Sequence, residues 1–371
     1  MELEAATTQT LENRYAMSTQ TGIRVAATHW LLFCKYVAHR DHILLHGHLL
    51  PTQDRVQRAE ADLLVFATWL RRSYSAATVA TYITGVKAAH FAWAGVVSFR
   101  DLGVSFARVS LLLKILQRDQ PTQRRIKVPF TLAHFERLLP VVMREWVSGS
   151  YDVMRFWAMI TLAFQQLLRL NEIGNVQSES LANRHPMMVG HLSFRSSEGG
   201  ELAHPTSVAM ATRNLRSLHH AILRMPPSKA DPFACNHPLY LPLGRMEKAR
   251  FSPCWNLWFM VATHPVDPTV ADQVPLFQAS VSGVPRSTPP FTQVKAAVFW
   301  SDFKRFCRLA DVQYSQFGTH AFRVGGMNAL QDAGVGGPEI MAMGRWASDC
   351  FTHYSRRQRL QLMKISERMF G

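Results

Sequence analysis

The sequence predicts a mainly helical protein of two domains, the second of mixed α/β type with a small β-hairpin sheet. Three observations lead to this prediction. The chain has 371 residues, more than one hydrophobic core usually serves, so two domains are expected. Apolar residues recur at helical spacing along most of its length. Between residues 217 and 243 this pattern changes to two short apolar runs, 220–225 and 238–242, around a turn-rich segment, which is typical of a hairpin.

The first domain is expected over residues 20–118, after a polar, flexible arm at residues 1–19 and with a loop at about 40–60. One helix is expected to begin after Ser75, a favourable N-cap, and to end at Gly95. Apolar residues recur at helical spacing, which predicts a helical bundle in which they face inward. These residues are Leu63, Phe66, Ala67, Leu70, Val79, Tyr82, Ile83, Val86, Trp93, Val109, Leu112, Leu113 and Leu116.

A linker is expected at residues 119–128, because the chain there is rich in proline and cations and poor in apolar residues. The second domain then covers residues 129–371. Thr131 is a candidate N-cap of its first helix, and a later, strongly apolar helix is expected to end at Arg169. The residues expected to face inward from these two helices are Leu132, Phe135, Leu138, Leu139, Phe156, Ile160, Phe164, Leu167 and Leu168.

The charge balance points to a polyanionic partner. Lys and Arg number 41 against 26 Asp and Glu, which gives a net charge of +15, and nucleic acid is the commonest partner of so basic a protein. A basic protein without such a partner is the alternative that charge alone leaves open. The five scattered cysteines form no disulfide framework, the polar start does not resemble a secretory signal, and no apolar stretch could span a bilayer. A soluble intracellular protein is therefore expected.

Three separated segments hold residues that suit chemistry on a phosphodiester. Arg169 ends an apolar helix, His320 and Arg323 stand one helical turn apart, and Trp346 precedes Tyr354 by eight residues. A tyrosine hydroxyl can attack a phosphodiester and conserve its energy as a phosphotyrosine. Arginines bind phosphate bidentately without losing their charge, and a histidine can bind the same phosphate or move the tyrosine proton. Taken alone, Arg169 could be a helix-capping cation and Trp346 a core residue, but their joint order favours one shared site.

The order Arg, His-x-x-Arg, Gly-x-Trp, Tyr resembles the catalytic signature of the tyrosine recombinases. Tyr354 follows His320 by 34 residues, close to the separation usual in that family. Two short motifs, Gly344-Arg-Trp-Ala-Ser-Asp and Ser228-Lys-Ala-Asp-Pro-Phe, are similar to those of Crypton and DIRS-type recombinases of eukaryotic mobile elements. The resemblance covers residues 129–371 and extends more loosely over the helical domain before them.

This resemblance implies a site-specific DNA recombinase or integrase that forms a 3′-phosphotyrosine intermediate without metal, ATP or another cofactor. Tyr354 would be its nucleophile, and Arg169, His320 and Arg323 would hold the phosphate. Lys229, at a hairpin turn, would protonate the leaving 5′ oxygen. Residues 20–118 would form a SAM-like core-binding domain and residues 129–371 the catalytic domain.

Two of the implied positions remain open. Trp346 would donate a hydrogen bond from its indole and pack beside the site, but Arg345 could occupy the equivalent position. An insertion near residues 180–215 lengthens the separation between Arg169 and the lysine motif, so Arg195 or Arg224 could take the role of Lys229. No Cys-x-x-Cys spacing or nucleotide-binding glycine loop accompanies these residues, so no metal site and no nucleotide cofactor are expected.

Double-stranded DNA is the expected partner, gripped between the two domains. Lys87 and the linker cations Arg124, Arg125 and Lys127 are predicted to contact phosphates. Self-association on DNA, as a dimer or tetramer, is expected from the resemblance, and the tail around 360–370 could pack on a neighbouring subunit or on its own. The protein would act in the nucleus of a eukaryote, or in the cytoplasm and nucleoid of a prokaryote.

Two other functions are alternatives to that of a mobile-element recombinase. One is a catalytically silent DNA-binding protein derived from such an enzyme, although a protein that only binds has no need of Tyr354. The other is a type IB topoisomerase, which shares the phosphotyrosine chemistry. The compact helical first domain and the Gly344-Arg-Trp motif favour a recombinase over a topoisomerase.

Overall fold

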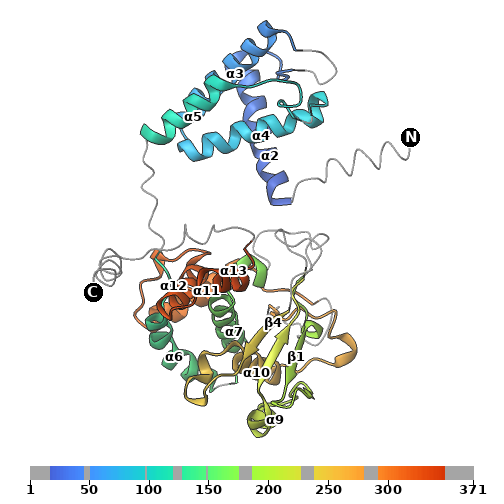
Figure 1. Ribbon diagram of the computed structural model, residues 1–371, viewed down its shortest axis with the longest axis vertical. Helices are drawn as coiled ribbons and strands as arrows, with labels where there is room; N and C mark the ends of the chain where they lie inside the picture. The colour runs from blue at the N-terminus through green and yellow to red at the C-terminus, as the bar shows by residue number, and fades with distance from the viewer. Residues whose placement is uncertain are drawn as a thin grey trace. The chain divides into compact units, whose positions relative to one another are not determined.

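A computed structural model describes residues 17–45, 51–96, 98–119, 128–147, 149–174, 186–226, 238–279 and 291–346. The chain divides into two compact units, within residues 1–125 and 126–371, each described here by itself (Figure 1). The described part is mainly helical with one small antiparallel sheet, which confirms the predicted fold class. None of the helices it contains has the length and apolar character that a membrane crossing requires.

The first unit is a helical bundle. Its helices are α2 (Met17–Phe33), α3 (Gln53–Arg71), α4 (Ala76–Ala94) and α5 (Ala107–Asp119), with a π-helical turn η1 (Cys34–Ala38) after α2. Helix α4 has the predicted caps, because the Ser75 side chain accepts a hydrogen bond from the Thr78 amide and Gly95 takes a left-handed conformation with φ 66°. Helix α3 begins at Gln53, inside the loop expected at 40–60, so that loop is shorter than predicted.

The core of this unit forms where α2, α3 and α4 meet. Most of the predicted inward residues of α3 and α4 are fully buried, and they pack against two aromatic residues of α2, Trp30 and Phe33. Helix α5 also follows the prediction. Its Val109 is fully buried, and Leu112, Leu113 and Leu116 are partly buried against the same core. Leu111, outside the predicted stripe, is exposed.

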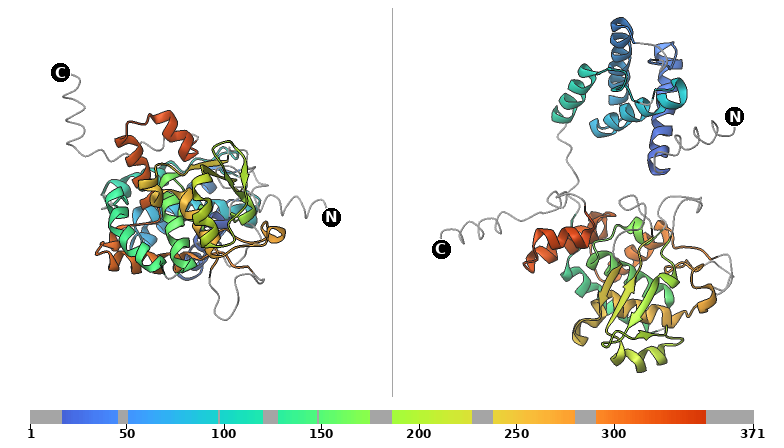
Figure 2. Two further views of the ribbon diagram at one scale, coloured as in Figure 1. Left: turned by 90° about the horizontal axis from the view of Figure 1, so that it is seen from below. Right: turned by 45° about the vertical axis from the view of Figure 1, so that its right-hand side comes forward.

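The second unit is built around α7 (Tyr151–Gln165), whose residues from Val153 to Phe164 are all buried. A helix that is buried on every side lies at the centre of a domain. Helix α7 contacts α10 and α12 (Figures 1 and 2). The other α-helices are α6 (Leu132–Trp146), α8 (Leu170–Ile173), α9 (Val208–Asn214), α10 (Pro253–Thr263), α11 (Ala296–Leu309), α12 (Ala321–Asp332) and α13 (Gly337–Gly344). Short 3₁₀ turns are η3 (Val189–His191), η4 (Leu215–Ser217), η5 (Met246–Phe251), η6 (Pro268–Val270) and η7 (Tyr314–Gln316).

One predicted inward residue of α6 is wrong. Thr131 caps the helix as expected, and Phe135 and Leu138 are buried, but Leu132 is 54% exposed. Leu132 is the first residue of the helix, ahead of the turn at which α6 reaches the core.

The sheet has the order β2-β1-β3-β4, with every neighbouring pair antiparallel. Its strands are β1 (Leu192–Arg195), β2 (Glu201–Leu202), β3 (His220–Leu223) and β4 (Leu239–Pro242). Strands β3 and β4 confirm the predicted hairpin, whereas β1 and β2 were not predicted. Alternate residues of β1, β3 and β4 are buried, and Phe194 packs edge-on against Trp258 of α10, which covers that face.

Two glycines bring α12 close to its neighbours. A Cβ at Gly325 would lie 1.7 Å from the Phe130 carbonyl oxygen, and one at Gly326 would lie 1.9 Å from the carbonyl oxygen of Phe164 on α7. A side chain at either position would push α12 away from the backbone it packs on. This close approach positions the start of α12, where His320 and Arg323 stand.

Gly326→Ala is therefore expected to lower the free energy of unfolding by roughly 1–3 kcal/mol, since its methyl group overlaps backbone that cannot move aside easily. Urea unfolding of the purified protein measures this change. Gly22→Ala is the matched control, because α2 leaves open space around Gly22 and alanine is the better helix former. Equal stability of the two variants would contradict the close packing of α12.

Candidate functional site

The segments that carry Arg169, His320–Arg323 and Trp346 come together in the second unit. They are held by a small core in which Leu167, Met327 of α12 and Ile340 of α13 are fully buried against one another. Trp346 packs against the same core. Residues distant in the sequence thus meet where α8 and α12 begin and α13 ends (Figure 1).

Arg169 begins a helix rather than ending one. Helix α7 stops at Gln165, and the chain then turns through Leu167, which is left-handed with φ 51°. Arg169 is the N-cap residue of the short helix α8: its backbone N–H donates to Glu172 Oε2 at 2.7 Å, and its Nη1 donates to Glu172 Oε1 at 3.1 Å. The prediction that the apolar helix ends at Arg169 is wrong, and a C-terminal capping role on α7 is excluded with it.

Arg323 lies in the first turn of α12, the helix whose N-cap residue is His320. Its side chain is 2% exposed, and its Nη2 donates to the Gly344 carbonyl oxygen at 3.0 Å. Its Nη1 lies 3.8 Å from Glu172 Oε2. Thus Arg169 and Arg323, the two arginines predicted to hold a phosphate, share one carboxylate. His320, the half-buried N-cap residue of α12, stands three residues before Arg323.

The end of α13 brings Trp346 and Arg345 to the same place. The Trp346 ring centroid lies 4.6 Å from the Arg323 guanidinium carbon, a cation–π contact. Gly344 makes room for this ring, because a Cβ there would lie 2.6 Å from it. Arg345 ends α13 in a left-handed conformation with φ 51°, and its Nη2 donates to Glu172 Oε2 at 3.3 Å.

Glu172 is the residue that sequence reasoning missed. Its carboxylate receives Arg169, Arg323 and Arg345 from three different segments. A local signal was present, since Arg169 and Glu172 have the three-residue spacing of a capping box, although arginine is not the usual N-cap. Guanidinium groups bind phosphate bidentately, so three of them around one carboxylate form a candidate site for an anion such as a phosphate.

Several other predicted site residues are not among those that the structure describes. Tyr354, Lys229, Arg124, Arg125 and Lys127 lie outside the described residues. The segment that carries Lys229 connects β3 to β4.

The three remaining candidate cations are Arg195, Arg224 and Lys87, and each of these residues has contacts within its own unit. Arg195 forms an ion pair with Glu201 at 3.0 Å across β1 and β2, and the Arg224 backbone N–H donates to the His191 carbonyl. The roles proposed for these cations stay predictions.

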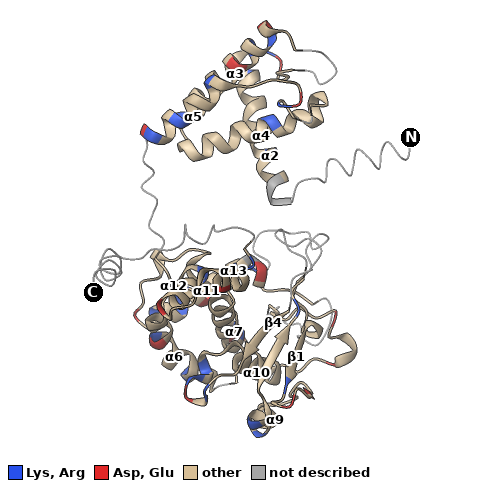
Figure 3. Ribbon diagram, viewed as in Figure 1, with Lys and Arg blue, Asp and Glu red and all other residues tan. Residues whose placement is uncertain are grey.

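Lys87 is engaged within the first unit. Its ammonium lies 4.9 Å from the Phe106 ring centroid, and burial lowers the pKa of Lys87 while the nearby Glu60 carboxylate opposes that shift. Glu60 in turn accepts a hydrogen bond from the Arg108 backbone N–H at the start of α5. The contact of Lys87 with DNA stays a prediction. Lys and Arg of the described residues are spread over helices of both units (Figure 3).

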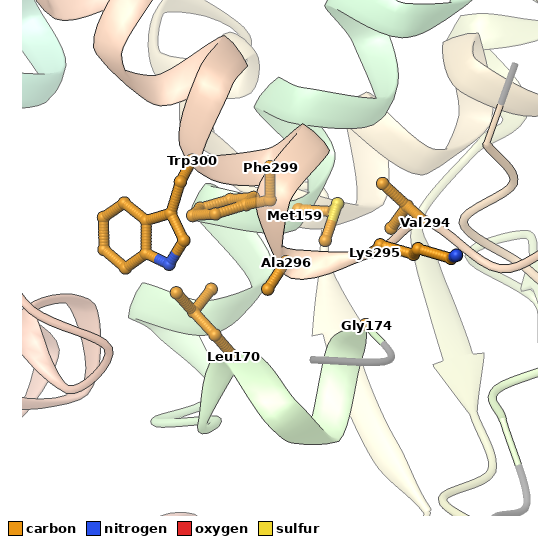
Figure 4. Close-up of a pocket in the computed structure, with 8 residues that line it drawn as sticks. All are labelled: Met159, Leu170, Gly174, Val294, Lys295, Ala296, Phe299 and Trp300. Atoms are coloured by element: carbon orange, nitrogen blue, oxygen red, sulfur yellow. The ribbon is translucent and has the colours of Figure 1, made fainter. Parts of the chain in front are cut away.

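Two further features of the described residues bear on ligands. They contain no group of three or more His, Cys, Asp or Glu side chains arranged to hold a metal ion. A small pocket lies between Leu170 and the start of α11 (Figure 4). Its lining is apolar apart from Lys295, so it offers little to an anionic substrate.

Comparison with known proteins finds remote structural likeness alone. No protein-family model matches this sequence, and no curated protein matches it. A solved structure of a Tn1549 transposon integrase fragment with circular intermediate DNA is 13% identical, with a TM-score of 0.44 over 91% of this chain and 98% of that one. A substituted form of the same fragment with transposon right end DNA is 12% identical, with a TM-score of 0.41 over 92% of this chain and 99% of that one. Likeness at this level assigns no activity, so a functional conclusion rests on the residues of this chain.

Proposed function

We propose that this chain is a tyrosine recombinase that cuts and rejoins double-stranded DNA through a covalent bond to Tyr354. The observation that carries the proposal is the convergence of Arg169 and Arg323 on Glu172, with His320 in the same helical turn as Arg323. These residues were singled out from the sequence for chemistry on a phosphate, and they come from segments far apart in the chain.

In the proposed reaction the Tyr354 oxygen attacks the phosphorus of a DNA phosphodiester. The bond from phosphorus to the 5′ oxygen breaks, and the DNA 3′ end remains on the enzyme as a phosphotyrosine. Arg169 and Arg323 bind the non-bridging oxygens and stabilise the charge that develops on them. His320 takes the tyrosine proton or hydrogen-bonds the phosphate, and Lys229 gives a proton to the leaving 5′ oxygen.

Rejoining is the reverse reaction with the 5′ hydroxyl of another strand. The phosphotyrosine retains the energy of the broken bond, so the proposed cycle consumes no ATP. The net charge of +15 favours association with DNA, and affinity that depends on phosphate contacts falls steeply with salt. The motifs at Gly344 and Ser228 further suggest an enzyme of a mobile element of the Crypton or DIRS type.

Nicked duplexes of randomised sequence provide a test that needs no knowledge of the DNA site. Cleavage a few nucleotides from a nick releases a short strand that diffuses away, which traps the covalent complex. The wild-type protein is expected to retain a subset of the pool through denaturing electrophoresis, and sequencing of that DNA gives the site. A protein that binds and shifts the pool in a native gel, yet retains none under denaturing conditions, is a DNA-binding protein without the proposed activity.

A further inference from the structure

A third arginine, Arg345, belongs to the cluster around Glu172. The two residues are 173 apart in the sequence, yet Arg345 Nη2 lies 3.3 Å from Glu172 Oε2. The Arg345 side chain is 12% exposed, and its backbone holds the left-handed conformation that glycine usually adopts at the end of a helix. Backbone strain of this kind persists where the surrounding structure enforces it, and it gathers at functional sites.

The charge of the cluster depends on Arg345. Arg345 adds a third guanidinium group to the two that Arg169 and Arg323 place around Glu172. A phosphodiester carries one negative charge, and the five-coordinate transition state of tyrosine attack carries two. The added positive charge therefore stabilises the transition state more than the ground state, which is the condition for catalysis.

Trp346 occupies a different place. Its ring makes a cation–π contact with the Arg323 guanidinium and fills the space that Gly344 leaves open. This contact fixes the orientation of Arg323, while the Arg345 fork points at the carboxylate that the other arginines share.

We infer that Arg345 is a third phosphate-binding arginine of the proposed recombinase, and that Trp346 is a positioning residue for Arg323. The inference rests on the proposed function. Its ligand is the phosphate at which DNA is cut, and Glu172 holds the three guanidinium groups in place before that phosphate arrives. Of the three side chains Arg169 is the most exposed, at 42%, which marks the side from which the phosphate enters.

The test uses two forms of the nicked duplex recovered from the randomised pool. One has the natural phosphodiester at the cleaved position, and the other has a methylphosphonate, in which a methyl group replaces one charged oxygen. Arg345→Gly is the main variant, because it removes the guanidinium while relieving the left-handed backbone. On the phosphodiester, its rate of covalent complex formation is expected to fall about 10²-fold or more below wild type. On the methylphosphonate, which is uncharged before attack, the deficit is expected to shrink to less than about tenfold, because its transition state carries one negative charge instead of two.

Two controls separate this role from a structural one. Arg345→Lys keeps the charge without the fork and is expected to fall between wild type and Arg345→Gly. Arg216→Ala removes an exposed cation of the same unit, outside the cluster, and is expected to cleave both duplexes at the wild-type rate. Thermal unfolding of each variant shows whether it is folded.

The outcomes are distinct. An Arg345→Gly deficit of equal size on both duplexes would assign Arg345 a structural role and overturn the inference, and so would a wild-type rate on the phosphodiester. If the wild-type protein forms no covalent complex with any duplex, the proposed function itself fails.

Discussion

Replacing Arg323 by lysine is expected to slow covalent complex formation by roughly 10²–10³-fold, although the positive charge is retained. The guanidinium is almost fully buried between the Gly344 carbonyl, to which it donates, and the Trp346 ring. A planar fork can keep these contacts and still present N–H groups to a phosphate, whereas an ammonium group is a single point of charge. The measurement is the single-turnover rate on the nicked duplex, with DNA binding followed in parallel.

The matched control for Arg323→Lys is Arg137→Lys. Arg137 also bridges to another segment, since its guanidinium donates to the Ala310 and Asp311 carbonyl oxygens, but it lies outside the Glu172 cluster. Its lysine variant is expected to cleave at the wild-type rate. An Arg323→Lys protein that is folded, binds DNA and cleaves within about threefold of wild type would remove Arg323 from the catalytic machinery.

The largest expected effect on stability comes from Arg155, a buried arginine that the proposed reaction does not use. It donates to Asp152 Oδ1 at 2.5 Å, to the Gln278 carbonyl oxygen at 2.8 Å and to Asp302 Oδ2 at 2.9 Å. It thereby joins the central helix α7 to α11 and to the backbone at Gln278. Arg155→Met removes one partner of a buried ion pair, so the free energy of unfolding is expected to fall by about 3–5 kcal/mol. Urea unfolding at pH 7 measures the loss.

The pH dependence of that loss has a definite sign. Burial raises the pKa of Asp302 above its ordinary 3.8, and the Arg155 charge opposes the shift. Without Arg155 the folded-state pKa rises further, so the folded protein binds more protons than the unfolded chain between 3.8 and that higher value. Its stability then falls as pH rises through this window. The deficit of Arg155→Met relative to wild type is therefore expected to be smaller near pH 4 than at pH 7.

A second substitution separates the ion pair from simple loss of packing. Adding Asp302→Leu to Arg155→Met removes the stranded carboxylate and is expected to restore much of the lost stability at pH 7. If the double variant is no more stable than Arg155→Met, or if the deficit does not change with pH, the buried charge is not the cause.

Much of the fold was predictable because its signals are local. Ser75 and Gly95 end α4 as predicted, since the cap and the left-handed glycine act within one turn of the chain. The β3–β4 hairpin was predictable from two apolar runs around a turn. Strand β2 was not, since two residues are too few to show an alternating pattern.

Chemistry on a phosphate constrains residue type and order, and on that ground the sequence assigns Arg169 and Arg323 to one shared site. The two side chains do meet in the structure, at Glu172. Glu172 was not found, because its role depends on how α8, α12 and α13 pack on the core that Leu167 completes. That packing requires Leu167 to be left-handed, and no glycine or asparagine marks the turn in the sequence.

In the proposed reaction DNA is held covalently by Tyr354, one of eight tyrosines in the chain. The direct test is proteolysis of the wild-type covalent complex, followed by mass spectrometry of the peptide that retains a nucleotide. Digestion is expected to give a nucleotide-linked peptide containing Tyr354, and Tyr354→Phe is expected to form no covalent complex. A nucleotide on any other residue, or a Tyr354→Phe protein that still forms the complex, would contradict the account.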